Sequence, residues 1–161
     1  MRINLRILVL SDSHGDVNNM QYVIDRHKDA KYIIHAGDGI EQFEDLSYLY
    51  PNKKFIMVSG NNDWGSNYPY ELLTQIDKTR IFIAHGHTMG VYFSTEPLYK
   101  AAVKYNAKIA IYGHTHIANV EYRDGIYIMN PGSIKRPRDG QKSYGFIDIT
   151  PNGVVCAINR I

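Results

Sequence analysis

Five short polar segments of the chain carry side chains of the kinds that bind divalent metal ions. Each contains aspartate, asparagine or histidine, and each directly follows an apolar run. In order they are Asp12-Ser13-His14, Gly37-Asp38, Gly60-Asn61-Asn62-Asp63, His85-Gly86-His87 and Gly113-His114-Thr115-His116. A single segment of this kind is more often a strand end or a helix cap. Their recurrence along one short chain predicts a shared metal site instead.

The donor atoms indicate which ions and which chemistry to expect. Carboxylate, imidazole and amide ligands without cysteine suit manganese, iron, nickel or zinc, and the imidazoles argue against a calcium site. These ligand types do not choose among the four metals, and manganese is our first expectation. Two such ions about 3.5–4 Å apart orient and activate a water for in-line attack on phosphorus. A bridging carboxylate sets that spacing, and Asp38 is the candidate.

The apolar runs before these segments predict the strands that position them. They are short and aliphatic, as expected of strands buried on both faces, and comprise 7–10, 32–34, 55–58, 80–84 and 109–112. Apolar residues at helical spacing predict helices over 17–27, 41–50 and 96–105. Since neighbouring parallel strands end at one edge of a sheet, the polar segments converge there. Residues two apart in extended chain point the same way, so Asp12 with His14, and His114 with His116, would each present two ligands.

The last forty or so residues change from alternating helices and strands to hairpins. Segments 119–122 and 126–129 flank Asp124-Gly125, and segments 144–149 and 154–158 flank Asn152-Gly153. Asp-Gly and Asn-Gly supply the positive φ angles that tight turns need. With no linker, repeat or low-complexity segment, residues 1–161 are expected to form one α/β domain. Its architecture would be a two-sheet β sandwich with helices on both outer faces.

Composition argues against several other classes of protein. Eighteen Lys and Arg against 16 Asp and Glu leave a net charge of +2, so we expect no stable nucleic-acid binding. The N-terminal residues run straight into strand-like sequence without a signal peptide or membrane span, which favours a cytoplasmic protein. Cys156 is the single cysteine and lies in an apolar run, so we expect a buried thiol. A homodimer is the expectation only by base rate.

The five segments in this order resemble the motif of the calcineurin-like metallophosphoesterase family, which reads Asp-x-His, Gly-Asp, Gly-Asn-His-Asp or -Glu, His, and Gly-His-x-His. The match spans nearly the whole chain. The short length and Asn130-Pro131-Gly132-Ser133 are similar to the small bacterial and archaeal branch, in which phosphodiester hydrolysis is usual. The resemblance implies one metal held by Asp12, His14, Asp38 and His116. It implies a second held by Asp38, Asn61, His85 and His114, and it implies the same two-sheet fold.

Asn62 departs from this family pattern. The family usually has histidine there, or cysteine in some small members, and that residue assists the leaving group. An asparagine donates a hydrogen bond to a phosphoryl oxygen but gives up no proton at neutral pH. We therefore expect modest turnover and a preference for good leaving groups. His87 is a candidate substitute acid, although a supporting or surface role fits it equally well.

Other polar residues have weaker functional readings. Asp63 could orient a histidine ligand or the attacking water from behind the ligands. The segment Lys135-Arg136-Pro137-Arg138 either places the Arg136 guanidinium on a substrate phosphate or is a solvated basic loop. We expect structural roles for His27 and His35. Three tyrosines in loop-like sequence could stack on a base or aryl group, although packing is the more common role; they are Tyr68, Tyr70 and Tyr92.

The leading functional prediction is a metal-dependent phosphodiesterase acting on a small phosphodiester, with His114 and Asn62 placed to contact the phosphoryl oxygens. The absence of a Gly-x-Ser-x-Gly motif agrees with a water nucleophile. One alternative is a binding or scaffold module on the same fold that has lost catalysis, and Asn62 is the only feature in its favour. Another is a phosphomonoesterase or protein phosphatase, for which the short chain leaves little room for extra loops. The natural substrate is not readable from the sequence.

Overall fold

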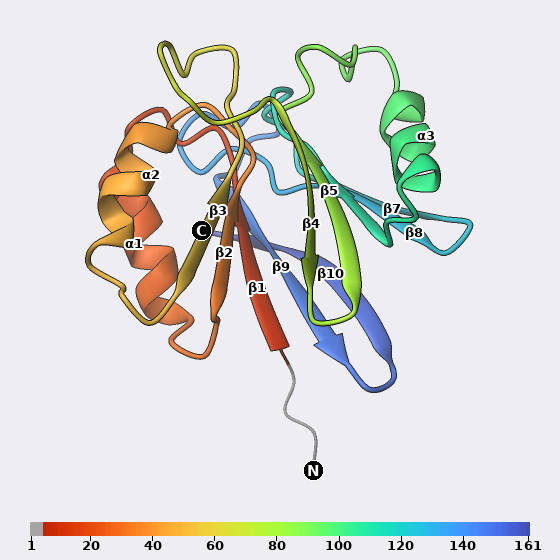
Figure 1. Cartoon of the computed structure of the whole chain (residues 1–161). Helices are drawn as coiled ribbons and strands as arrows, with labels where there is room; N and C mark the ends of the chain where they lie inside the picture. Colours follow the sequence, from red (N-terminus) through yellow and green to blue (C-terminus); the bar gives the residue numbers. More distant parts are fainter. Residues whose placement is uncertain (1–4) are drawn as a thin grey trace.

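The chain folds into two five-stranded mixed sheets that pack face to face, as a computed structural model describing residues 5–161 shows (Figure 1). The first sheet contains β1 (Leu5–Leu10), β2 (Tyr32–His35), β3 (Lys54–Met57), β9 (Ser143–Thr150) and β10 (Gly153–Arg160). The second contains β4 (Glu71–Ile76), β5 (Thr79–Ala84), β6 (Ile109–Ile111), β7 (Asn119–Arg123) and β8 (Ile126–Asn130). Their orders are β10-β9-β1-β2-β3 and β4-β5-β6-β8-β7. The first four residues, which bear on the expectation of no signal peptide, lie outside the described residues.

Helices cover the outer faces of the sandwich. Helices α1 (Val17–Arg26) and α2 (Ile40–Ser47) pack on the first sheet, and α3 (Glu96–Lys104) packs on the second (Figure 1). Asp16 starts α1, because its side chain accepts the Asn19 N–H at 3.0 Å, as a helix cap does. The α/β sandwich with helices on both outer faces, predicted from the sequence, is confirmed.

Alternation along β1 shows why both faces of this strand are apolar. Ile7 and Val9 point into the cluster between the two sheets, whereas Leu8 and Leu10 point into the cluster beneath α1 and α2. All four side chains are buried. A strand buried on both faces reads as a continuous apolar run, which is the pattern that predicted it.

The parallel strands of both sheets end at the same edge of the sandwich. In the first sheet Leu10 pairs with His35, which pairs with Met57. In the second sheet Ile83 pairs with Ile111, which pairs with Met129. The loops that follow these strands gather at the top of Figure 1. The five polar segments identified in the sequence therefore all lie at this edge.

One strand was missed by the sequence analysis, which treated the region before residue 80 as a loop. Strand β4 pairs antiparallel with β5 through a turn at Asp77, whose φ is 54°. It lies at the sheet edge and buries only Ile76 fully, so its apolar alternation is weak. Cys156 is buried as predicted, and burial raises the pKa of its thiol to about 12. None of the helices within residues 5–161 has the length and apolar character needed to span a bilayer.

Candidate functional site

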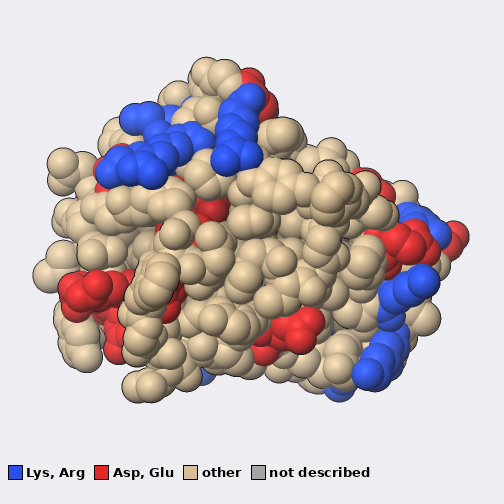
Figure 2. Space-filling view, turned by 90° about the horizontal axis from the view of Figure 1, so that it is seen from above, with Lys and Arg blue, Asp and Glu red and all other residues tan. Residues whose placement is uncertain are grey.

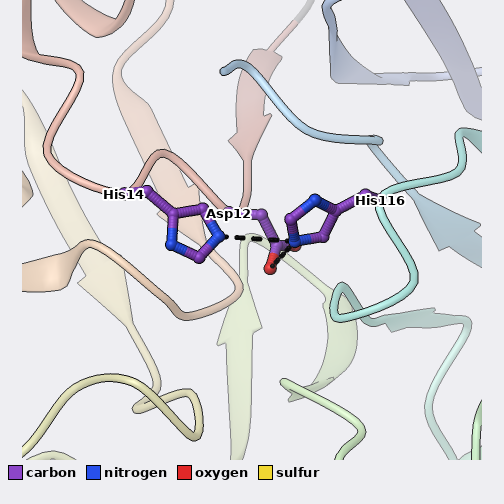
Figure 3. Close-up of side chains that lie close together, drawn as sticks. All are labelled: Asp12, His14 and His116. Carbon is purple, nitrogen blue, oxygen red and sulfur yellow. Dashed lines mark hydrogen bonds and ion pairs between the residues drawn. The ribbon is translucent and has the colours of Figure 1, made fainter. Parts of the chain in front are cut away.

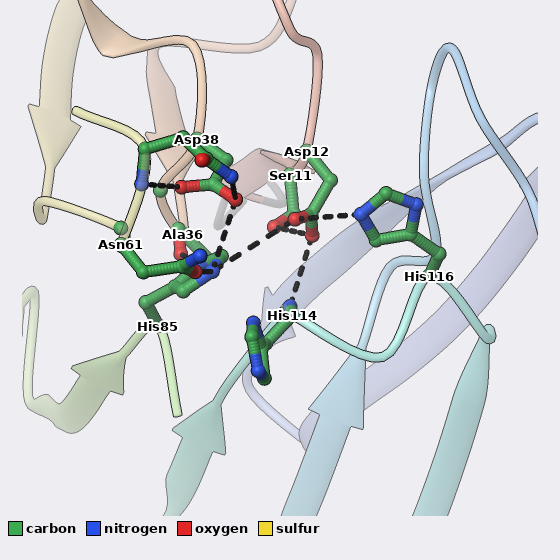
Figure 4. Close-up of polar contacts among 12 residues, drawn as sticks. Ser11, Asp12, Ala36, Asp38, Asn61, His85, His114 and His116 are labelled. Carbon is green, nitrogen blue, oxygen red and sulfur yellow. Dashed lines mark hydrogen bonds and ion pairs between the residues drawn. The ribbon is translucent and has the colours of Figure 1, made fainter. Parts of the chain in front are cut away.

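Side chains from all five polar segments meet at the shared strand edge (Figure 4). The segments follow β1, β2, β3, β5 and β6, so both sheets contribute to the site. Asp12, Asp38 and His85 are buried, and His116 nearly so. Burial of two carboxylates and several imidazoles in one place is costly unless charge pairing or an ion compensates.

The first group of candidate ligands is formed by Asp12, His14 and His116 (Figure 3). The Nε2 atoms of the two histidines lie 3.3 Å apart, and His116 Nε2 lies 3.2 Å from Asp12 Oδ1. The three ligand atoms all lie within 4.8 Å of one another. Nitrogen and carboxylate donors so close together suit a transition-metal ion.

The second group consists of Asp12, Asp38 and His85, drawn in Figure 4. His85 Nε2 lies 3.4 Å from Asp38 Oδ2, 3.9 Å from Asp12 Oδ1 and 3.0 Å from Asn61 Oδ1. Asn61 thus adds an amide oxygen to this group. Asp12 is common to both groups, whereas the sequence analysis proposed Asp38 as the shared carboxylate.

Main-chain carbonyls orient two of these histidines. His85 Nδ1 donates to the Ala36 carbonyl at 2.7 Å, and His116 Nδ1 donates to the Arg136 carbonyl at 2.7 Å. With Nδ1 occupied in this way, the Nε2 lone pair of a neutral ring points toward the carboxylates. Asp12 Oδ1 is buried, and none of the residues that the structure describes donates a hydrogen bond to it. A buried acceptor left without a donor, facing two imidazole nitrogens, fits a divalent cation bound at this point.

Electrostatics keep both carboxylates ionised. Burial by itself raises the pKa of Asp12, but the nearby rings of His116 and His85 and the hydrogen bond from the Ser11 hydroxyl outweigh it and lower that pKa. Burial also raises the pKa of Asp38, and the contacts from His85 and Asn62 reverse the effect. The carboxylates in turn raise the pKa of His116, and that of His85 despite its burial. A divalent ion bound here would take the place of those imidazole protons.

Five of the seven residues predicted as metal ligands have a backbone in the left-handed conformation. The φ angle is 52° at Asp12, 45° at His14, 64° at Asp38, 70° at His114 and 60° at His116. The expectation that paired ligands lie two apart in extended chain is therefore wrong. Asp, Asn and His tolerate this conformation better than most residues, but each still costs free energy. Such strain concentrates at functional sites, where surrounding contacts enforce it.

Two predicted catalytic residues point elsewhere than expected. The His114 main-chain N–H donates to Asp12 Oδ2 at 3.0 Å, while its ring packs against those of Tyr92 and His85. Within residues 5–161, the His114 ring is in neither ligand group. Asn62 donates from its backbone and from its side-chain amide to the two oxygens of Asp38, each at 2.8 Å. Asn62 therefore orients a candidate ligand.

Asp63 supports the site through backbone amides and contacts no histidine by hydrogen bond. Its Oδ2 accepts the N–H groups of Asp38 and Gly60, both at 2.7 Å. Its Oδ1 accepts the N–H groups of Gly39 and Ile40 at 2.8 and 3.2 Å. One carboxylate thus ties the loop after β3 to the Asp38 loop and the start of α2. This differs from the expected role of orienting a histidine or a water.

The remaining predicted residues lie at the margin of the groups. His87 packs edge-on against Tyr70, and its buried Nδ1 lacks a hydrogen-bond partner. Burial lowers the pKa of His87. Arg136 contacts the site through its carbonyl, and its side chain is exposed. His35 is fully buried and donates from Nε2 to Ser13 Oγ at 2.8 Å, in keeping with a structural role.

Two buried polar residues that support the site were missed as such by the sequence analysis. Asn130 donates to the Gly113 carbonyl and to Thr115 Oγ1, which shapes the loop that carries His114 and His116. Ser133 donates to the Asp12 carbonyl at 2.8 Å. Asn130 is the last residue of β8 and Ser133 follows this strand, which ends at the same edge, and that position was the available signal. Gly113 leaves the room that Asp12 needs, because a Cβ there would lie 2.7 Å from Asp12 Oδ2.

The arrangement suits chemistry on a phosphate ester. Two adjoining groups of oxygen and imidazole donors share one carboxylate, as a pair of close divalent ions would require. Figure 2 shows a group of lysine and arginine side chains at the upper left of this face and a second group at its right, and their charge favours an anion. The thiol of Cys156 is buried between the two sheets, so it is not accessible as a nucleophile.

Comparisons with known proteins agree with this chemistry. A family model described as the calcineurin-like phosphoesterase superfamily domain matches residues 5–152. Phosphodiesterase YfcE of Escherichia coli (strain K12) is 38% identical over 174 aligned residues, covering 89% of this chain and 88% of that protein. A solved structure of a predicted phosphoesterase from Streptococcus pneumoniae TIGR4 has a TM-score of 0.80 at 28% identity, covering 99% of this chain and 100% of the other.

A further solved structure shares the fold alone. Vacuolar Protein Sorting 29 of Cryptosporidium parvum has a TM-score of 0.74 over 99% of both chains, at 19% identity. The family model, by contrast, spans most of the chain, and the aligned relative covers nearly all of it. The chain belongs to the calcineurin-like phosphoesterase superfamily.

Proposed function

We propose that this protein is a metal-dependent phosphodiesterase that holds two divalent ions and hydrolyses a small phosphodiester. The observation that carries the proposal is the buried Asp12 Oδ1, which has no donor and is shared by two groups of imidazole and carboxylate ligands. When bound, two divalent ions supply positive charge that stabilises the in-line transition state and acidifies water. The likeness to a protein named a phosphodiesterase supports the diester over the monoester.

Some residues of the site would bind the metal ions, and others would contact the substrate. Asp12, His14 and His116 would hold one ion, and Asp38, His85 and Asn61 the other, with Asp12 contributing to both. His114 is proposed as a substrate contact from its place beside Tyr92. Asn62 holds the Asp38 carboxylate in one orientation.

Proton supply to the leaving group is weak in this site. The Asn62 amide is engaged by Asp38 and gives up no proton at neutral pH. Burial lowers the pKa of His87, so its ring is neutral at pH 7 and is a poor acid. The protein should therefore cleave diesters whose alcohols leave without protonation, such as aryl esters, faster than alkyl diesters.

The ion is proposed to be manganese first, with nickel, iron and zinc as alternatives, and the oxygen and imidazole donors suit all four. The near balance of charges supports a small substrate over a stably bound nucleic acid. A cytoplasmic location and a homodimer are the accompanying proposals.

The test is hydrolysis of bis(4-nitrophenyl) phosphate by protein stripped of metal and then reloaded with manganese or nickel. Asp38→Ala is the control, because it removes one of the proposed ligands. We expect turnover that depends on added metal and disappears in the variant. A matched monoester, 4-nitrophenyl phosphate, should react more slowly. Failure to bind any metal would refute the proposal outright.

A binding module on the same fold is the second candidate function. Two observations favour it: the usual proton-donating position holds Asn62, and the fold is shared with a protein named for vacuolar sorting. About two metals bound per chain without turnover of aryl diesters would support this candidate over the enzyme.

A further inference from the structure

A cleft of about 720 Å³ opens directly beside the candidate ligands. His14 and Asn62 form its inner end, α2 forms one wall, and the loop after β3 forms the other. The volume is that of a site for one small organic group. Because the cleft begins at the metal-ligand groups, a substituent on a phosphate bound there would extend into it.

The walls of the cleft carry negative charge and no positive charge. Its lining includes the carboxylates of Glu41, Glu44 and Asp63, and it includes no lysine or arginine. Positive charge lies beside the ligands instead, where Lys135 Nζ donates to the His14 carbonyl. A phosphate is thus favoured at the ligands and disfavoured along the cleft.

The outer wall is held in place by its own contacts. Ser59 Oγ donates to the Tyr68 carbonyl at 2.8 Å, and the Tyr68 N–H donates to Ser66 Oγ at 3.1 Å. The Tyr68 ring packs against the apolar cluster beneath α1 and α2. Burial first, and then the charge and hydrogen bond of Glu44, raise the pKa of its hydroxyl. Asp63 anchors the start of the same loop to four backbone N–H groups.

Trp64 lies on this anchored loop and is the largest aromatic surface of the cleft. Its side chain is 89% exposed, so no neighbour in the described chain covers it. Single exposed aromatic residues are common and carry no meaning alone. Here the indole lines a cleft that opens onto the ligand groups, where it offers a flat face for stacking.

We propose that this cleft binds one ester substituent of the substrate, and that the substituent is a planar aromatic ring without negative charge, as in an aryl or nucleoside ester. Trp64 would stack on the ring, and the carboxylates of Glu41 and Glu44 would exclude substituents that carry further phosphates or carboxylates. The inference rests on the proposed function, since it requires a phosphoester at the ligand groups. It selects nucleoside-like or aryl phosphodiesters and excludes polyphosphates.

The test compares product-like ligands of matched shape by calorimetry on the manganese-loaded protein. Phenyl phosphate and cyclohexyl phosphate differ in aromaticity, and 4-carboxyphenyl phosphate adds a negative charge. We expect phenyl phosphate to bind roughly tenfold more tightly than cyclohexyl phosphate. The carboxyl compound should bind several-fold more weakly than phenyl phosphate. Since Trp64 is the only tryptophan, its fluorescence should also respond to phenyl phosphate and not to cyclohexyl phosphate.

Three variants locate the effect. Trp64→Ala should remove the preference for the aromatic ring, and Glu41→Gln should narrow the discrimination against the carboxyl compound. Phe93→Ala is the matched control, because Phe93 is an equally exposed aromatic residue, at 93%, outside the cleft. Phe93→Ala should leave unchanged the affinity of phenyl phosphate relative to cyclohexyl phosphate and relative to 4-carboxyphenyl phosphate.

Each outcome decides for or against the cleft. Equal affinities for the aromatic and cyclohexyl compounds would overturn the proposal, as would a preference that survives Trp64→Ala. Binding none of the three ligands would overturn it too. Calorimetry and fluorescence need no turnover. If the expected differences in affinity among the three ligands are found but no diester is hydrolysed, only the proposed catalytic function is refuted. If diesters are hydrolysed but the three ligands bind with equal affinity, only the proposed role of the cleft is refuted.

Discussion

Substitution of Asp63 tests the claim that the site depends on one carboxylate that touches no proposed ligand side chain. Each of its oxygens accepts two backbone N–H groups, from the Asp38 loop, the start of α2 and the loop after β3. In Asp63→Asn one oxygen becomes an NH2 group of the same size. Whichever way the amide turns, that NH2 faces two N–H donors, so two hydrogen bonds are lost.

The expected loss of stability follows from those two hydrogen bonds. A hydrogen bond to a charged group contributes about 1.5–3 kcal/mol. Asp63 is only partly buried, so water compensates in part, and we expect the free energy of unfolding to fall by about 2–4 kcal/mol. That is a large fraction of the roughly 5–15 kcal/mol by which domains are stable. Metal affinity should fall about 10–100-fold as well, because either orientation of the amide removes a backbone contact at Asp38 itself or at the next residue, Gly39, and so loosens the strained backbone of this ligand.

Urea unfolding of the metal-free protein measures the first effect, and manganese titration by calorimetry measures the second. Asp45→Asn is the matched control: it lies exposed on α2 and should change stability by less than about 0.5 kcal/mol. If Asp63→Asn unfolds at the same urea concentration as the wild type, the four hydrogen bonds of Asp63 do not stabilise the loop after β3. If stability fell but manganese affinity stayed unchanged, the link between Asp63 and the Asp38 position would be wrong.

Four further predictions concern single residues. Asp12→Asn should abolish binding of both ions in native mass spectrometry, because Asp12 is common to both ligand groups; retention of two ions would contradict the assignment. Asn62→His should raise turnover of alkyl diesters at least about tenfold more than that of aryl diesters, because it supplies a proton donor, and equal gains would argue against this role. Burial lowers the pKa of His35 to about 4 from 6.5, so the unfolded chain binds this proton more tightly. Stability should therefore be complete above about pH 6.5 and fall by about 3 kcal/mol as the pH drops to 4, less so in His35→Gln, as urea unfolding across pH will show. Cys156, with its pKa raised to about 12, should resist iodoacetamide at pH 8 until urea unfolds the chain, and rapid native labelling would count against its burial.

The sequence by itself determined the class of site and most of the fold. Continuous apolar runs predicted β1, β2, β5 and β6, because strands buried on both faces need apolar side chains throughout. The polar segments after them predicted a shared site, because parallel strands end together. Strand β4 escaped notice, since an edge strand buries few side chains and leaves a weak pattern.

Only the tertiary structure decided where each side chain points. The left-handed backbone at Asp12 and Asp38 is enforced by contacts from distant loops, and no local pattern encodes it. The same holds for the Asp63 carboxylate on four amides. Residue types and strand ends are local properties that the sequence states directly, whereas the direction of a side chain at a loop depends on partners far along the chain.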